Sequence, residues 1–484
     1  RFLLEGRPVF AAQRRLMQFS VFAMAVSRMA VTPRALQLSP GVLPQAKRPA
    51  CGPAGGSRAA AGAGGVAFLA AASGGAVGMR AWRPRHSTLR RLQLQRRGTF
   101  FSRVQRRAVV TVARPDELKG AKTDDHYNVP ASVVDKLGAD LLLRKKHPIG
   151  VLWQAMQEYF KASNPEMVFY DREDPIVNTV DNFDKLRLPP GHPGRSPSDT
   201  YYVNKDTVLR THTSAHQCKH MAEFPEVTSF LCAGDVYRRD EIDASHYPVF
   251  HQCEGVRLFD ATKVSVDEVK EDLKKTLEGL AAHLFNIKIG EKSMRWRDDY
   301  FPFTEPSYEL DIFYEDDWLE VLGCGVIHHE VLQNAGLDPA KVHGWAFGIG
   351  LERIAMVLFG INDIRLFWSD DKRFTEQFDE SAFSSKVKFK PFSKYPPVKK
   401  DISMWIPDDF VDNDLFEMIR DEGGDQVEKV DLIDEFTNKK TGKKSKAFRV
   451  IWRDMSRTLT NEEVNAKHEI VLKRIVEELA VELR

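Results

Sequence analysis

Acidic residues are nearly absent from the first part of this 484-residue chain. Residues 1–110 contain eighteen Arg, one Lys and a single acid, Glu5, which gives a net charge of +18. The whole chain has a net charge of +2, so the remainder carries −16. A basic segment with almost no acids is typical of an organelle transit peptide, and a basic tail that binds nucleic acid is the alternative. We predict a disordered transit peptide over residues 1–112.

Cysteine and long apolar runs are also scarce. The five cysteines (Cys51, Cys218, Cys232, Cys253 and Cys324) show no CxxC spacing, which indicates neither a zinc site nor a disulfide framework and fits a reducing compartment. The apolar stretch 66–77 is interrupted and too short to span a bilayer, although a secretory-type segment in a bipartite presequence is a further interpretation. We expect no membrane partner, and the length predicts two or three domains.

The stretch 234–255, GDVYRRDEIDASHYPVFHQCEG, is the most unusual part of the chain. It holds an arginine pair, five acids, two histidines and three aromatics between two apolar, strand-like runs. Two strands joined by a charged loop would hold these groups still while leaving them open to a ligand. The stretch therefore predicts a site for a ligand that carries both signs of charge, with a salt-bridged surface turn as the alternative.

Three shorter stretches also place polar groups at the ends of expected elements. Residues 209–217 (LRTHTSAHQ) lead from a strand into a helix, and a simple Ser/Thr helix cap is the alternative reading. Residues 344–360 run from glycines into an apolar helix with Glu352 and Arg353 in its first turn, but they match neither the Walker loop nor the dinucleotide fingerprint. Adjacent positions on a strand point apart, which argues against a metal site at residues 328–330.

The expected elements after residue 147 alternate between helices and strands. Apolar spacing predicts a helix from Pro148 and another over 265–285, while 300–314 and 317–332 read as paired strands. A Pro- and Lys-rich hinge follows Lys390. Beyond it we expect strand 401–406, helix 412–422, strands 427–436 and 447–452, a helix from Thr460 and a last strand near Ala480, the βαββαβ order of the ferredoxin-like fold. Five lysines in the turn 438–446 indicate contact with a polyanion or, equally, a solvated turn.

Taken together, these stretches resemble the organellar phenylalanyl-tRNA synthetases of class II. Residues 234–255 are similar to motif 2 of that class and residues 344–368 to motif 3, and THTSAHQ, NFDKLRLPPGHPGR, YFPFTEPSYEL, WLEVLGCGV and KYPPVKKDISMWIP also match. The resemblance implies an α+β fold: an N-terminal extension (113–147), a catalytic domain built on an antiparallel sheet (148–389) and a ferredoxin-like anticodon-binding domain (390–484). It also implies ATP, Mg²⁺, L-phenylalanine and tRNA(Phe) as ligands of a monomeric enzyme.

The resemblance assigns roles to individual residues. Arg238 would grip the α-phosphate with His212 near it, and Phe250 and Arg353 would sandwich adenine. Further ATP contacts would come from Ser245, His246, Tyr247 and Glu320, and Glu320 is the candidate Mg²⁺ ligand. The phenylalanine site would comprise Ser214, Ala215, His216, Gln217, Gln252, Glu254, Phe301, Phe303, Ala346 and Phe347. Catalysis would rest on positioning and charge stabilisation rather than on a nucleophilic side chain.

One departure from the family pattern and two rival functions bear on this reading. Gly191 stands where the family usually has Asp, which puts the contact of that loop with the tRNA end in doubt. The rivals are a non-catalytic RNA-binding paralogue and the catalytic subunit of a multi-subunit synthetase. The resemblance implies the mitochondrial matrix, the chloroplast stroma or both as the location.

Overall fold

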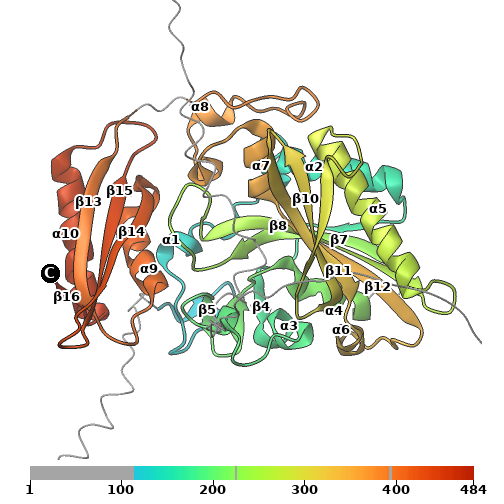
Figure 1. Cartoon of the computed structure of the whole chain (residues 1–484), viewed down its shortest axis with the longest axis horizontal. Coiled ribbons are helices and arrows are strands. Elements are labelled where there is room, and N and C mark those ends of the chain that lie inside the picture. The colour runs from blue at the N-terminus through green and yellow to red at the C-terminus, as the bar shows by residue number, and fades with distance from the viewer. Residues whose placement is uncertain (1–113, 224–225, 392–394) are drawn as a thin grey trace, which may run out of the picture. The chain divides into compact units, whose positions relative to one another are not determined.

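The computed structural model describes residues 114–223, 226–391 and 395–484, which lie in one compact unit (Figure 1). The expected transit peptide, residues 1–112, lies outside these residues. Among the described residues, no helix is long and apolar enough to cross a membrane.

A seven-stranded sheet forms the centre of the larger domain. Its order is β3–β7–β8–β12–β11–β10–β9, and all neighbours are antiparallel except β3 and β7. The strands are β3 (Val168–Tyr170), β7 (Ser229–Tyr237), β8 (Val249–Asp260), β9 (Met294–Asp299), β10 (Thr304–Tyr314), β11 (Asp317–Ile327) and β12 (Val342–Gly350). The expected hairpin of charged residues is therefore β7 and β8, in the middle of the sheet.

Three helices pack with this sheet in the largest hydrophobic cluster. They are α2 (Pro148–Ser163), α5 (Val266–Phe285) and α7 (Leu351–Phe359). The predictions of a helix from Pro148 and of one over 265–285 are confirmed, and Ser265 with Glu268 closes a capping box at the start of α5. These helices cover one face of the sheet, which leaves the other face for the remaining elements of the domain.

Short elements surround that other side. They are β4 (Ile176–Asn178), β5 (Tyr202–Asn204) and β6 (Thr207–Leu209), which form a three-stranded sheet, with α3 (Thr179–Asn182), the 3₁₀ turn η7 (Thr213–His216), α4 (Gln217–Glu223) and α6 (His329–Asn334). The segment before α2 holds β1 (Glu117–Leu118), β2 (Ala121–Lys122) and α1 (Ala131–Val134), and α8 (Lys372–Thr375) follows α7. Tyr127, Val129 and Val133 are buried against β5, β6, β7 and β8, so the expected N-terminal extension packs on the catalytic domain.

The C-terminal part has the predicted βαββαβ order. It comprises β13 (Val398–Ile406), α9 (Asp412–Gly423), β14 (Val427–Thr437), β15 (Lys444–Trp452), α10 (Asn461–Glu478) and β16 (Glu482–Leu483). The strand order β14–β15–β13–β16 is that of a ferredoxin-like sheet. The predicted capping box of Thr460 and Glu463 is present, and the α+β fold class is confirmed.

Two expectations about the strands of the larger domain were wrong. The strand expected over 317–332 ends at Ile327, because His328 caps a new helix, α6. The edge strand β9 was not predicted at all. Its arginines, Arg295 and Arg297, form ion pairs with Asp311 of β10, and such a partner is invisible in a local hydrophobic pattern.

Candidate active site

The pleat of β8 divides the charged stretch into two sets of side chains. Successive residues of a strand point to opposite faces of the sheet, so Phe250, Gln252 and Glu254 share one face. His251 and Cys253 lie on the other: Cys253 belongs to the main hydrophobic cluster, and His251 lies 2.7 Å from Oε1 of the buried Glu352 in α7. Glu352 also accepts a hydrogen bond from the backbone N–H of His251, so motif 2 and motif 3 are tied together beneath the site.

A pocket lies on the face that carries Glu254. It is lined by Ser214, Gln217, Glu254, Phe301, Phe303, Thr304, Gly323, Cys324, Ala346, Phe347 and Gly348. Seven of these were expected at the phenylalanine site. Thr304, Gly323, Cys324 and Gly348 were missed, because they enter through the pairing of β11 with β10 and β12, which no local pattern reveals.

The pocket has an aromatic end and a polar end. The rings of Phe301 and Phe303 are stacked, with centroids 6.0 Å apart and planes 12° apart. The polar side chains near Glu254 are buried, and two of their atoms make no hydrogen bond with the described residues, Oε1 of Gln217 and Nε2 of Gln252, while the carboxylate of Glu254 has only the hydroxyl of Ser214 beside it. Buried polar atoms are normally hydrogen-bonded, so these mark the place of a polar ligand.

Burial controls the charge of Glu254. It raises the pKa of this carboxyl to about 8, and the hydroxyl of Ser214 beside it offsets only part of that effect. A cation bound against Glu254 would favour the ionised form. The polar end therefore supplies acceptors for an ammonium group (Gln217, Glu254), and Gln252, two residues before Glu254 on the same face of β8, has a buried amide donor.

Arg238 marks the second half of the site. Its Nε donates a hydrogen bond of 2.8 Å to the backbone oxygen of Thr211, and its guanidinium lies 5.3 Å from the ring centroid of Phe250. His212 is buried nearby, and burial together with the charge of Arg238 lowers its pKa to about 3. A neutral imidazole beside a fixed guanidinium suits the recognition of an oxyanion.

The neighbouring Arg239 has a different task. Its side chain is buried, donates a hydrogen bond to the backbone oxygen of Pro197, and lies 3.1 Å from Asp414 and 3.6 Å from Glu417 of α9. The two arginines, which follow the end of β7, therefore have different partners: Arg238 contacts Thr211 and Phe250, and Arg239 contacts α9. Only Arg238 belongs to the candidate site.

The acids of the charged loop shape the loop itself. Asp243 accepts hydrogen bonds from the backbone N–H groups of Ser245 and His246 and lies 2.9 Å from Nδ1 of His246. Burial lowers the pKa of His246, but the bond to Asp243 and the nearby acids outweigh it and raise the pKa to about 9. The hydroxyl of Tyr247 donates to Asp425 in the C-terminal domain. Of the three loop residues expected at ATP, His246 is thus a cation at neutral pH, and Tyr247 is held by the other domain.

Glu320 lies between two arginines. Its carboxylate is 3.8 Å from Nη1 of Arg353 and 3.5 Å from Nη2 of Arg297, and that same Nη2 lies 2.5 Å from Glu309. Carboxylate oxygens are the donors that Mg²⁺ prefers in proteins. Glu320 and Glu309 could thus offer oxygen ligands to a divalent cation, but in this structure both carboxylates are paired with arginines.

Three residues expected at phenylalanine do not line the pocket: Ala215, His216 and Gln252. His216 lies 2.9 Å from Nη1 of Arg210 and 3.5 Å from Glu173. Phe347 borders the pocket, but its ring stacks on Phe160 of α2 at 5.9 Å.

Gly255 makes the position of Phe347 attainable. A Cβ atom on Gly255 would lie 2.1 Å from Cε1 of Phe347 and 2.8 Å from Cδ2 of Leu231. The ring of Phe347 in β12 thus fills the space that a side chain at Gly255 of β8 would take, and the two residues are partners in the strand register.

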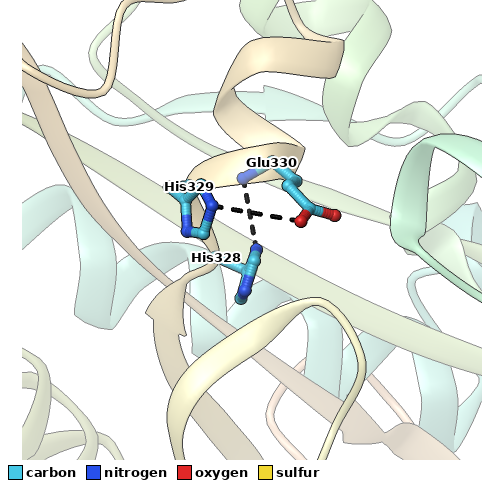
Figure 2. Close-up of side chains that lie close together, drawn as sticks. All are labelled: His328, His329 and Glu330. Atoms are coloured by element: carbon cyan, nitrogen blue, oxygen red, sulfur yellow. Dashed lines mark hydrogen bonds and ion pairs between the residues drawn. The ribbon is translucent and has the colours of Figure 1, made fainter. Parts of the chain in front are cut away.

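The cluster of His328, His329 and Glu330 is explained by a helix cap (Figure 2). Nδ1 of His328 accepts a hydrogen bond of 3.2 Å from the backbone N–H of Glu330, and Glu330 is paired with Arg187 at 2.7 Å. Nitrogen and oxygen atoms of the three lie within 4.8 Å of one another, so the reason given against a metal site, that they lie apart on a strand, was wrong. The helix cap engages Nδ1 of His328, and Arg187 engages the carboxylate of Glu330.

Comparisons with known proteins match both domains of the chain to protein families. Residues 134–378 match the model of the tRNA synthetases class II core domain (F), and residues 393–484 match that of the ferredoxin-fold anticodon binding domain. The chain is 51% identical over 383 residues to the phenylalanine–tRNA ligase, chloroplastic/mitochondrial, of Arabidopsis thaliana, covering 78% of this chain and 86% of that protein. It is 43% identical over 402 residues to the mitochondrial phenylalanine–tRNA ligase of Mus musculus, covering 76% and 88%.

Proposed function

Because the chain belongs to the organellar phenylalanine–tRNA ligases of class II, we propose that the pocket around Glu254 binds L-phenylalanine beside ATP. The enzyme joins the two as phenylalanyl-adenylate with release of pyrophosphate, and transfers the phenylalanyl group to tRNA(Phe). The chain acts in an organelle as a monomer, in the mitochondrial matrix, the chloroplast stroma or both.

One observation carries the assignment of the amino acid. A single pocket joins the stacked Phe301 and Phe303 to the buried polar side chains of Gln217 and Glu254, and Gln252 lies on the same face of β8 as Glu254 with a buried amide nitrogen that makes no hydrogen bond among the described residues. An α-amino acid with an aromatic side chain supplies the three complements: a ring, an ammonium group and a carboxylate. Aromatic pairs of this kind contribute ~0.5–1.5 kcal/mol beyond burial.

The chain's own residues account for activation without a nucleophile or general base. Arg238 holds the α-phosphate while the amino acid's carboxylate attacks it, and the neutral His212 lies beside the reacting group. Phe250 and Arg353 hold the adenine ring between them, where stacking contributes ~1–3 kcal/mol. Glu320 would hold Mg²⁺, and a bound Mg²⁺ would supply positive charge beside the phosphates of ATP. The protein thus positions two substrates and stabilises charge.

The test is phenylalanine-dependent exchange of pyrophosphate into ATP by the purified chain, followed by charging of tRNA(Phe). We expect phenylalanine to support the exchange, and tyrosine and leucine not to support it. A chain that binds tRNA but catalyses no exchange with any amino acid would instead be the non-catalytic paralogue.

The C-terminal domain makes a second subunit unnecessary for recognition of tRNA. Residues 393–484 match an anticodon-binding module within the same chain. Charging of tRNA(Phe) by the purified chain alone is therefore expected, and a requirement for an added subunit would contradict the monomeric assignment.

A further inference from the structure

Arg210 is a buried cation to which the proposed reaction assigns no role. It directly follows β6 and precedes the stretch that leads into η7. Its side chain is only 1% exposed, and a buried charge is costly unless its N–H groups find partners within the protein. Those partners show what the arginine does.

The guanidinium of Arg210 joins three segments of the chain. Nε donates to the backbone oxygen of Asp235 at 2.7 Å, and Nη2 donates to the carboxylate of Asp235 at 2.8 Å. Nη1 donates to the backbone oxygen of Glu173 at 3.2 Å and lies 2.9 Å from Nε2 of His216. These contacts connect β7, the loop before β4 and η7, while Arg210 itself does not line the phenylalanine pocket.

The contact with Arg210 also fixes the protonation of His216. An arginine only donates hydrogen bonds, so Nε2 of His216 is the acceptor and the ring proton lies on Nδ1. Nδ1 is 3.5 Å from the carboxylate of Glu173. Burial and the charge of Arg210 lower the pKa of His216 to about 2, so the ring is neutral at physiological pH. His216 is therefore held between a guanidinium on one side and a carboxylate on the other.

Gly234 of β7 provides the space for this guanidinium. A Cβ atom at Gly234 would lie 2.0 Å from Nη2 of Arg210 and 3.0 Å from its Cζ. Gly234 is paired with Gln252 in the strand register, so its absent side chain would point to the face of the sheet that carries Gln252 and Glu254. The glycine that opens motif 2 thus admits Arg210 to that face.

The polar end of the pocket depends on the segment that Arg210 anchors. Ser214 lies within η7, His216 ends it, and Gln217 follows directly as the first residue of α4. Both Ser214 and Gln217 line the pocket. An apolar side chain at position 210 would fill the same space without the cost of burying a charge. The hydrogen bonds to η7 and to β7 are what the arginine adds.

We propose that Arg210 is a positioning residue for the amino acid: through His216 it fixes the backbone that carries Ser214 and Gln217. Gly234 is required because it leaves room for the guanidinium. The proposal rests on the proposed function, which makes the pocket a site for phenylalanine. Without the anchor, the acceptors for the ammonium group shift, and a misplacement of about 1 Å already costs much of an enzyme's efficiency.

The experiment measures the dissociation constant for phenylalanine by isothermal titration calorimetry with the full chain, well below the melting temperature of each variant. Arg210→Met should weaken binding about 13- to 160-fold, the equivalent of one hydrogen bond to a charged group. His216→Leu, which removes the acceptor, should weaken it within the same range. His216→Gln should recover most of the affinity, because its amide oxygen can replace Nε2 as the acceptor. In pyrophosphate exchange, His216→Leu should raise the KM for phenylalanine more than the KM for ATP.

Gly234→Ala separates this role from a general weakening of the fold. In the wild-type background the added methyl group displaces the guanidinium, so this variant should lose affinity as Arg210→Met does. Methionine lacks the Cζ and Nη atoms that the methyl group meets, so Gly234→Ala should weaken Arg210→Met by less than about twofold further. Gly290→Ala is the matched control, since a Cβ atom there has no neighbour within 4 Å, and its affinity should equal that of the wild type.

Three results would overturn the positioning role: unchanged affinity in Arg210→Met and His216→Leu, no recovery in His216→Gln, or additive losses when Gly234→Ala and Arg210→Met are combined. If Arg210→Met does not fold, the two His216 variants still decide the question. Phenylalanine binding and pyrophosphate exchange by the wild-type chain test the proposed function separately. A wild type that is active, with variants that bind phenylalanine equally well, would refute the positioning role alone.

Discussion

Binding of phenylalanine should depend steeply on pH through Glu254. Its pKa is about 8 in the ligand-free protein, so about a tenth of the molecules carry the carboxylate at pH 7 and about a hundredth at pH 6. Only the ionised form pairs with the ammonium group, and the apparent dissociation constant equals the intrinsic one divided by that fraction. The dissociation constant should therefore fall about tenfold from pH 6 to pH 7 and level off above pH 8.

Isothermal titration calorimetry without ATP measures this directly. Titrations in buffers of different ionisation enthalpy should show about 0.9 proton released per phenylalanine bound at pH 7, since that fraction of Glu254 must ionise. Glu254→Gln should bind without pH dependence and about 13- to 160-fold more weakly at pH 8, the equivalent of a hydrogen bond to a charged group. At pH 6 the affinities of the wild type and of Glu254→Gln for phenylalanine should differ far less than at pH 8.

The sign of the effect on stability provides a second readout. Between pH 4.5 and pH 8 the folded chain holds the proton on Glu254 more tightly than the unfolded chain does, so this group lowers the stability as the pH rises through that window. Glu254→Gln should therefore gain stability over the wild type towards pH 8. Glu320→Gln, at the nucleotide end, should retain the pH slope of phenylalanine binding. A wild type that binds equally at pH 6 and pH 8 would refute the reasoning.

Three further changes test the pocket and its support. Ala346→Gly should admit para-substituted phenylalanines in pyrophosphate exchange, and unchanged selectivity would contradict the placement of Ala346 in the pocket. Phe303→Leu should raise the KM for phenylalanine about 2- to 13-fold, the worth of one aromatic pair, with less effect on the KM for ATP. Glu352→Gln should lower the free energy of unfolding by ~1–3 kcal/mol in denaturant titration, because His251 then loses a buried acceptor. An unaltered midpoint would show that the pair of His251 and Glu352 contributes nothing to stability.

Local signals in the sequence were sufficient for much of the fold. The capping box of Thr460 and Glu463 and the apolar stripe of the helix from Pro148 are both set by residues a few positions apart, and both are present. The resemblance to a family then supplied the roles of distant residues. Seven of the ten residues expected at phenylalanine line one pocket.

What the sequence could not provide depends on partners far along the chain. Nothing local distinguishes Arg238 from Arg239, and the split appears only once α9 supplies Asp414 and Glu417. The role of Asp243 likewise appears only in the structure, where its carboxylate accepts the backbone N–H groups of Ser245 and His246 and holds the turn. Gly191, the departure from the family pattern, is exposed, and a Cβ atom there would have no neighbour within 4 Å. The contact of this loop with the tRNA end stays a prediction.

The contact of Gly255 with Phe347 has a consequence for engineering new amino-acid specificity. The ring of Phe347 fills the space that a side chain at position 255 would take, and it rests in turn on Phe160 of α2. Gly255, Phe347 and Phe160, from three different elements, therefore pack in series on the helix side of the sheet, opposite the side chain of Ala346. A mutant library that replaces the pocket-lining residue Phe347 would disturb this packing as well as the pocket, so Phe160, which does not line the pocket, should be varied together with it.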